Sequence, residues 1–332
     1  MLFFDLYFYP QMSATVQQIT PTIYLAPLQG FTDFVYRKAY AEIFQGIDTF
    51  FIPYISVKNS VIIKKYEKEI LPGNNIQNRV IPQFLASNAE EMLFLSEILH
   101  QKGYTEINLN LGCPYPMVTN REKGAGLLPH PDKLKELLST FFEKTNLRLS
   151  VKLRAGLVDP TEIERIVPVL NQFPLTEVIF HPRIAKQLYE GEIYHSAFQF
   201  AEIHLKHKLV YNGDIFSIDD FKTKQNLFPK TTNWMLGRGV LMNPFLPAEI
   251  NNIEITAKEK LEKLKEFHHL VFKYYSETMD NEGNTINKMK QFWIYFSYNF
   301  GNQRKCFKLI NKSNGLSKYQ YATNFIFREM IN

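Results

Sequence analysis

Short runs of β-branched and aromatic residues recur along the first 240 positions, and amphipathic stretches separate most of them. The eight runs are TIYLAPL (22–28), TFFIPYIS (49–56), VIPQFLA (80–86), EINLNLG (106–112), SVKLRAG (150–156), EVIFHPR (177–183), KLVYNGDI (208–215) and WMLGRGV (234–240). The clearest amphipathic stretches, 88–103 and 131–146, have apolar residues at helical spacing. Strands that alternate with helices predict a parallel sheet with right-handed crossovers. Eight such units predict a (β/α)8 barrel over residues 21–247.

An open dinucleotide-binding sheet is the main alternative fold, but the turn after the first run argues against it. The segment APLQGFTD (26–33) has one glycine where the dinucleotide fingerprint needs three.

The pattern changes after Pro247, where the alternation of strands and helices stops. Four helical stretches follow, at 255–279, 284–300, 302–314 and 316–330, and they predict a small helical bundle over 251–332. The aromatic run between Phe292 and Phe300 is expected mainly in the core of this bundle.

Residues 1–20 form an expected N-terminal tail. The opening MLFFDLYFYP has neither a preceding basic residue nor a small-residue cleavage site, so it does not resemble a signal peptide. A start at Met12 would remove this segment. The sequence leaves open whether residues 1–11 are an N-terminal tail or the result of a misplaced start.

Composition narrows the class of protein further. The chain has 332 residues, of which 45% are hydrophobic and 21% charged, as in a globular protein with a large core. Two cysteines cannot form a disulfide framework, which favours a reducing, cytoplasmic compartment. No apolar run reaches the roughly 18 residues of a membrane span. The net charge of +5 lies entirely in residues 251–332, with 13 basic and 8 acidic residues, and this predicts a polyanion-facing surface there.

Polar residues cluster where the predicted strands end. They are Gln29, Gln83, Asn110, Cys113, Lys152, Arg154, His181, Arg183, Asn212, Asp214, Gly237 and Arg238. Individually, Lys152 or Arg154 has an alternative reading as a surface charge, and His181 as a core histidine. Twelve such groups in one register instead predict an active site, because the carboxyl ends of barrel strands meet on one face.

Cys113 lies in NLNLGCPYPM (108–117), just beyond a predicted strand and against two prolines that stiffen the chain. A thiol with a pKa of about 8.5 is mostly protonated at neutral pH, so it can donate a proton. The following YPMVTNREKGAG reads as a loop able to close over a bound molecule. Cys306, on a basic helix, is expected to be structural.

These blocks resemble the tRNA-dihydrouridine synthases, which are flavin-dependent (β/α)8 barrel enzymes. The resemblance rests on APLQGFTDFVYR (26–37), IPQFLA (81–86), INLNLGCPYPMVTNREKGAGLL (107–128), VKLRAGLVD (151–159), FHPRIAKQLYEGEIY (180–194), YNGDI (211–215) and MLGRGVLMNPFL (235–246). Two departures, Gln29 in place of a small residue and Leu157 in place of an aromatic one, remove no reactive group.

The resemblance implies FMN as cofactor, NADPH as electron donor and a tRNA uridine as substrate. The residues it implies for FMN are Pro27, Leu28, Gln29, Gln83, Lys152, His181, Asn212, Gly213, Asp214, Gly237 and Arg238. Cys113 would donate the proton to C5, and Asn110, Arg154 and Arg183 would contact the substrate. The helical end would bind tRNA, with Lys288, Lys290, Arg304, Lys305 and Lys308 as candidate phosphate contacts. No metal site is expected, and a monomer is the default.

Two other functions compete with this reading. One is a flavin barrel that reduces a small molecule, such as a dihydroorotate-type enzyme or an ene-reductase, although such an enzyme has no use for a basic helical appendage. The other is a tRNA-binding protein that has lost catalysis, against which the presence of Cys113 and Lys152 argues.

Overall fold

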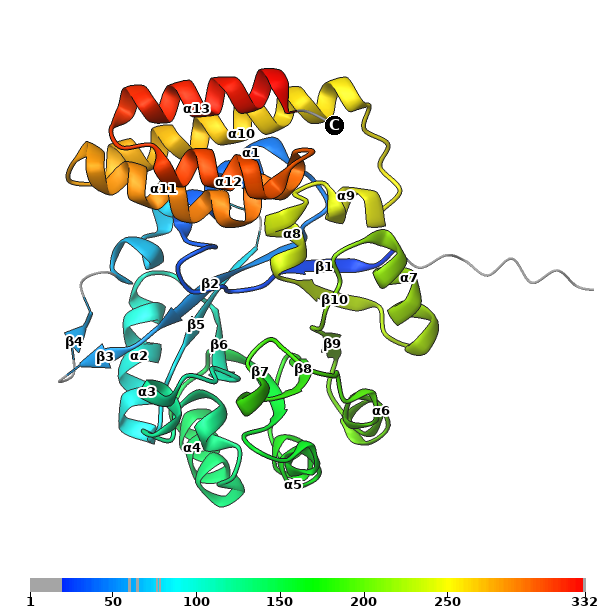
Figure 1. Ribbon diagram of the computed structural model, residues 1–332. Helices are drawn as coiled ribbons and strands as arrows, with labels where there is room; N and C mark the ends of the chain where they lie inside the picture. The colour runs from blue at the N-terminus through cyan, green and yellow to red at the C-terminus, as the bar shows by residue number, and fades with distance from the viewer. Residues whose placement is uncertain (1–19, 59–60, 64–65, 76, 78, 331–332) are drawn as a thin grey trace, which may run out of the picture.

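Eight parallel strands close into a barrel in the computed structural model, which describes residues 20–58, 61–63, 66–75, 77 and 79–330 (Figure 1). The strands are β1 (Thr22–Leu25), β2 (Thr49–Ile55), β5 (Val80–Phe84), β6 (Glu106–Leu111), β7 (Arg148–Gly156), β8 (Val178–Ile184), β9 (Leu209–Tyr211) and β10 (Asn233–Leu236). Strand β1 pairs with both β2 and β10, which closes the ring. The predicted barrel is therefore confirmed.

Helices follow most strands and cover the outside of the barrel. They are α1 (Phe34–Ile43), α2 (Ala89–Gln101), α4 (Pro131–Lys144), α5 (Ile163–Leu170), α6 (His195–His204), α7 (Ile218–Leu227), α8 (Arg238–Met242) and α9 (Leu246–Ile250). The two clearest amphipathic stretches of the sequence became α2 and α4. Between β2 and β5 the described residues form an antiparallel strand pair, β3 (Val57–Lys58) with β4 (Val61–Ile62), and the 3-10 turns η2 (Lys68–Ile70) and η3 (Pro72–Asn74).

The last two strands are shorter than their sequence pattern predicted. Strand β10 ends at Leu236, and residues 237–240, which we expected in the strand, instead cap and begin α8. Likewise β9 ends at Tyr211, and the next residues form a turn. The residues that follow, 212–214 (Asn-Gly-Asp) and 237–239 (Gly-Arg-Gly), are glycines and polar residues, which are depleted in strands, so each strand ends where its apolar run ends.

The barrel interior is filled by side chains rather than open. A layer of buried residues, among them Tyr24, Phe51, Ile179 and Met235, packs at its centre. Below this layer the Tyr24 hydroxyl donates to Glu177 (2.8 Å), which also pairs with Lys208 (3.3 Å). Glu177 and Lys208 directly precede β8 and β9, so this ion pair lies at the amino ends of the strands, opposite the face where barrel enzymes have their active sites.

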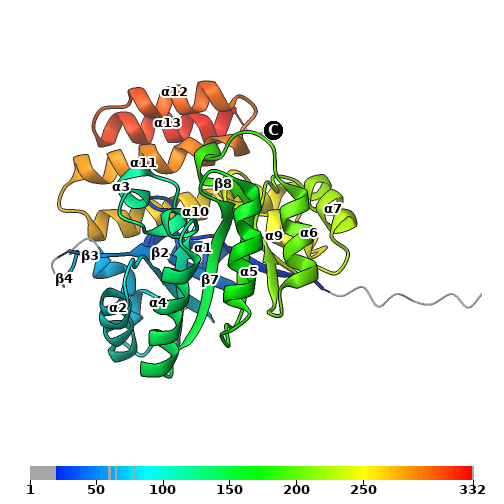
Figure 2. The same ribbon diagram turned by 90° about the horizontal axis from the view of Figure 1, so that it is seen from below.

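Four helices follow the barrel: α10 (Ala257–Thr278), α11 (Glu282–Phe296), α12 (Gln303–Lys312) and α13 (Leu316–Glu329). Both views show them together on one side of the barrel (Figures 1 and 2). Helix α10 begins with a capping box formed by Thr256 and Glu259. Its Phe267 packs edge-on against Tyr36 of the barrel helix α1 and against Phe44, the residue that follows α1.

The aromatic run of α11 lies mainly in the core, as expected. Trp293, Phe296 and Phe300 are buried, whereas Tyr298 is half exposed. Cys306 is also buried, and its sulfur lies 3.7 Å from that of Met330, in agreement with the structural role expected for it. One continuous apolar core runs from the barrel into these helices. The tail predicted for residues 1–20 falls almost wholly outside the described residues.

Candidate active site

A cavity opens at the carboxyl ends of the barrel strands. It encloses about 840 Å³, including space open to solvent, which is in the size range of ligand pockets. Of the residues predicted from the sequence, those that line it are Pro27, Leu28, Gln29, Gln83, Asn110, Cys113, Lys152, Arg154, His181, Asn212, Gly213, Asp214, Gly237 and Arg238. The barrel topology therefore gathers residues from both ends of a segment of more than 200 positions.

Asn110, the penultimate residue of β6, fixes the turn that carries Cys113. Its Oδ1 accepts hydrogen bonds from the backbone N–H groups of Gly112 and Cys113, each at 2.8 Å. Its Nδ2 donates to Oε1 of Gln83 (2.6 Å), and Gln83 donates in turn to Asn108 (2.8 Å). This chain of amides is buried, and a fully paired buried network holds its members in one geometry.

Cys113 lies at the edge of the cavity and is 6% exposed. Burial raises the pKa of its thiol, and the hydrogen bond with the Tyr115 backbone, Tyr54 and Arg154 oppose that effect. The thiol is therefore protonated at neutral pH, as the sequence argument assumed.

The loop after Cys113 folds back against it. It contains the short helix α3 (Pro116–Thr119), and the backbone N–H of Ala125 donates to the Cys113 carbonyl (3.1 Å). Gly124 has a φ of +57°, and a Cβ atom there would lie 2.8 Å from Cβ of Cys113. Only glycine fits this approach without displacement, because the conformation is left-handed and the contact is with a fixed turn.

Lys152 and His181 bring polar groups into the cavity, and neither group forms a hydrogen bond or an ion pair with a described residue. The Lys152 ammonium group makes no hydrogen bond or ion pair in the described part of the chain. Burial, with Arg154 nearby, lowers its pKa to about 7. Burial and the same cations hold the pKa of His181 well below its usual value, so its imidazole is neutral. Both side chains are thus available to a ligand.

Arg154 stabilises the far side of the Cys113 turn. Its Nε donates to the carbonyl of Gly112 (3.0 Å), and its NH1 group donates to the carbonyl of Ile184 (3.0 Å). The guanidinium group also lies 5.4 Å from the centre of the Tyr189 ring. Arg154 lines the cavity as predicted, but much of its hydrogen-bonding capacity is already used by the backbone.

Asp214 gathers two arginines at the other end of the cavity. Arg183 pairs with both of its carboxylate oxygens (3.0 and 2.7 Å), and Arg238 donates to Oδ1 (2.8 Å). Arg183 also donates to the carbonyl of Gly191 (2.7 Å) and is 4% exposed. Arg183 is not among the residues that line the cavity. Its predicted contact with substrate therefore gains no support from its position, which is behind Asp214.

The turns after β9 and β10 leave backbone donors free. The N–H groups of Gly213, Asp214, Gly237 and Arg238 donate to no described residue. At Gly239 an added Cβ would lie 2.1 Å from the carbonyl oxygen of Ile215, so a glycine is needed for these two turns to meet. Four free donors beside Arg238 form a place where an anionic group can be held.

The cavity contains aromatic residues that the sequence argument did not single out. They are Tyr54, Tyr115, Tyr189 and Phe216. The Tyr189 ring is flanked by the guanidinium groups of Arg154 and Arg238, which lie 5.4 and 4.9 Å from its centre. Tyr54 is the penultimate residue of β2, so its position near a strand end could have identified it, whereas Tyr189 comes from a loop whose position depends on the folded barrel.

The five basic residues proposed for tRNA phosphates do not share one environment. Arg304, Lys305 and Lys308, on α12, are exposed. Lys290 is half-buried, with no partner in the described part of the chain. Lys288 instead pairs with Asp33 (3.0 Å) and donates to the carbonyl of Gly30 (2.7 Å). It belongs to the contact between α11 and the barrel.

In the part of the chain that the structure describes, no three His, Cys, Asp or Glu side chains form a cluster able to hold a metal ion. Within the same residues, no helix combines the length and the apolar character that a membrane span requires.

A closed parallel barrel with a polar cavity at the carboxyl ends of its strands defines the class of (β/α)8 barrel enzymes. The solved structures with the same fold include morphinone reductase (TM-score 0.50, 10% identity, covering 70% of this chain and 85% of that one). The old yellow enzyme from Trypanosoma cruzi is similar to the same degree (TM-score 0.50, 7% identity, covering 70% and 88%). These likenesses concern the fold alone.

The particular family follows from the sequence. Residues 24–325 match the model of the family described as dihydrouridine synthase (Dus), and the chain belongs to this family of tRNA-modifying oxidoreductases. It is 26% identical to tRNA-dihydrouridine synthase B of Pasteurella multocida over 230 residues, which is 69% of this chain and 68% of the relative. It is 25% identical to tRNA-dihydrouridine(16) synthase of Neisseria meningitidis serogroup A over 283 residues, or 82% and 84% of the two chains. The tRNA-dihydrouridine(20/20a) synthase of Vibrio cholerae is 25% identical over 251 residues, or 71% and 75%.

Proposed function

We propose that this protein reduces the C5=C6 bond of one uridine in tRNA to 5,6-dihydrouridine, with FMN as bound cofactor and NADPH as electron donor. The proposal rests on two groups that line the same cavity of a Dus-family barrel. One is the protonated thiol of Cys113, which is held in one position, and the other is the amine of Lys152, which has no described partner. The reaction needs a hydride at C6 and a proton at C5, and protein side chains donate only the proton.

The residues present fit a flavin mononucleotide. Lys152 and His181 are the polar side chains without partners that a flavin ring and its ribityl chain would satisfy. The free N–H groups at Gly213, Asp214, Gly237 and Arg238 suit a phosphate, and the Arg238 guanidinium adds positive charge. When bound and reduced, FMN would supply the hydride. Lys152 would then stabilise negative charge on the reduced ring, and this would raise its own pKa again.

The side chains around Cys113 determine where the proton is given. Asn110 and Arg154 hold the turn from two sides, so the thiol keeps one position relative to the cavity. Burial keeps the thiol protonated until it is used. After transfer, the thiolate would lie near the Arg154 guanidinium, which stabilises it until it is protonated again.

A uridine within folded tRNA must leave its stack to enter such a cavity, so the enzyme also has to bind the surrounding RNA. The exposed basic residues of α12, Arg304, Lys305 and Lys308, with Lys290 on α11, are the candidates for phosphate contacts. We infer that residues 251–332 act as the tRNA-binding module and that Lys288 has a different role.

The test is incubation of purified protein with unmodified tRNA and NADPH, followed by mass spectrometry of the nucleosides. A uridine heavier by two hydrogens is expected, and fragment mapping gives its position. The relatives named for tRNA positions 16 and 20/20a are both 25% identical to this chain, so mapping is needed to choose between these positions. The Cys113→Ala variant is the control and should accept electrons from NADPH without reducing tRNA. A flavin-containing protein that never modifies tRNA but reduces a small enone would overturn the proposed substrate.

A further inference from the structure

The loop between β1 and α1 contributes Pro27, Leu28 and Gln29 to the cavity. Beyond Ala26, whose N–H donates to the carbonyl of Leu236 (2.8 Å), the hydrogen bonds within this loop are short-range. The Leu28 N–H donates to Oγ1 of Thr32 (2.8 Å), Thr32 donates to the carbonyl of Ala26 (3.1 Å), and the N–H of Phe31 donates to the carbonyl of Leu28 (2.9 Å). These bonds shape the turn but do not attach it to the rest of the molecule.

Two side chains of the helical bundle attach this loop from one side. Lys288 of α11 donates to the carbonyl of Gly30 (2.7 Å) and pairs with the carboxylate of Asp33 (3.0 Å). The Tyr275 hydroxyl of α10 lies 2.9 and 3.0 Å from the two carboxylate oxygens of Asp33. Side chains of Lys288 and Asp33 are 17% and 15% exposed. A charge-assisted pair so shielded from water is stronger than one on the surface.

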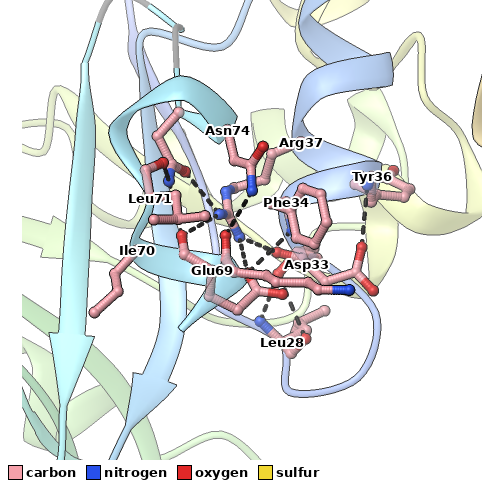
Figure 3. A network of polar contacts seen from close by, with 12 residues as sticks. Leu28, Asp33, Phe34, Tyr36, Arg37, Glu69, Ile70, Leu71 and Asn74 are labelled. Atoms are coloured by element: carbon pink, nitrogen blue, oxygen red, sulfur yellow. Dashed lines mark hydrogen bonds and ion pairs between the residues drawn. The ribbon is translucent and has the colours of Figure 1, made fainter. Parts of the chain in front are cut away.

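A second set of contacts fixes the loop from the barrel side (Figure 3). Arg37 donates to the carbonyl of Thr32 (2.7 Å) and pairs with Glu69 (3.1 Å), which accepts from the N–H of Phe34 (3.0 Å). Arg37 is fully buried, and its NH2 group donates a hydrogen bond to Oδ1 of Asn75 (2.8 Å). This side is built from the barrel alone, so the polar contacts of Lys288 and Tyr275 come from the bundle, together with the edge-on packing of Tyr295 on Phe31 (5.0 Å between ring centres).

Gly30 shows how closely the bundle approaches. It has a φ of +84°, and a Cβ atom there would lie 3.1 Å from Nε2 of Gln291 on α11. The carbonyl group that accepts the hydrogen bond of Lys288 is therefore one residue from Gln29, in a left-handed turn that needs glycine. The chain thus passes directly from the cavity wall to the bundle contact.

We propose that Lys288 is a positioning residue: through Gly30 and Asp33 it sets the loop that forms one wall of the cavity, so that the bundle also determines how the cofactor is bound. This rests on the proposed function in that FMN is the ligand. The role assigned to Lys288 replaces a phosphate contact, because its charge is already neutralised and its amine faces the barrel.

The experiment compares FMN binding by the full-length wild-type protein, Lys288→Met, Lys288→Arg and the control Lys273→Met. Lys273 is an exposed lysine of α10, two positions before Tyr275, and has no described partner. FMN is removed, and its dissociation constant is measured from the quenching of flavin fluorescence, with the visible flavin spectrum recorded on the rebound protein. The increase in melting temperature on FMN addition is measured in parallel, because a ligand stabilises only what binds it.

Loss of one shielded charge-assisted contact should weaken FMN binding by about tenfold in Lys288→Met. We expect an altered flavin spectrum, a smaller FMN-induced rise in melting temperature, partial recovery in Lys288→Arg, and a change of less than about twofold in Lys273→Met. A Lys288→Met protein that melts earlier without FMN but binds FMN as tightly as wild type would overturn the inference and leave Lys288 a purely structural residue. Wild-type protein that takes up no FMN would instead overturn the proposed cofactor.

Discussion

Replacing Lys152 by methionine should make the cofactor-free protein more stable while abolishing its activity. The amine is placed in the cavity without a partner, and its pKa is lowered to about 7. In an unfolded chain a lysine has a pKa of about 10.4. The folded state therefore releases a proton that the unfolded state keeps, and maintaining this side chain costs stability.

The pKa difference sets an upper bound. Each pKa unit corresponds to about 1.4 kcal/mol, so a lowering from 10.5 to about 7 corresponds to a cost of at most about 5 kcal/mol when both states are protonated. The side chain is only half-buried, and water reduces this cost, so we expect about 2 kcal/mol near pH 6.5. Between pH 7 and 10.4 the unfolded state binds more protons, so the cost declines as pH rises.

The assay is urea unfolding of the cofactor-free wild type and Lys152→Met at several pH values between 6.5 and 9.5. The variant should be more stable at pH 6.5, and the difference should shrink toward pH 9.5. Lys290→Met, which replaces a half-buried lysine outside the cavity, should show no such convergence. Added FMN should reduce the gain, because it gives Lys152 a partner. Equal stability of Lys152→Met and wild type at pH 6.5 would refute the reasoning that burying the protonated amine of Lys152 destabilises the folded protein.

Four further outcomes are expected. Cys113→Ala should slow tRNA reduction by about 10²- to 10⁴-fold in single-turnover measurements, with flavin reduction by NADPH unchanged; parallel loss of both steps would contradict a proton-donor role. Because burial raises the pKa of the Cys113 thiol, tRNA reduction should persist above pH 8.5 and fall only when the thiolate forms, and a decline already at pH 7.5 would argue against it. Gly124→Ala should cost at least about 2 kcal/mol in urea unfolding, since it combines a left-handed φ with a 2.8 Å contact at Cys113, and an unchanged midpoint would show that the loop shifts freely. Replacing Arg304 and Lys308 together by glutamine should weaken tRNA binding and lower the slope of log affinity against log salt by about one per residue; an unchanged slope would place the phosphates elsewhere.

Much of the barrel was predictable because its signals are local. Hydrophobic periodicity depends on neighbours a few residues apart, and it placed eight strands and the four C-terminal helices within a few positions. The position of a polar residue at a strand end is also local, and closing the barrel makes all such ends meet. This is why Cys113, Lys152 and Asn212 were found from sequence and line one cavity.

The partners of the charged residues were not predictable in this way. Arg183 has the same strand-end placement as its neighbours, yet it faces Asp214, and Lys288 looks like other lysines of a basic helix, yet it pairs with Asp33. Periodicity says which face of an element is buried but not which distant group meets it. The strength of an ion pair depends on the distance between the charges and on their shielding from water, and both are set only when the bundle and barrel are packed together. The sequence by itself therefore determined the fold and the chemical groups of the site, whereas the tertiary structure decided which groups remain free for a ligand.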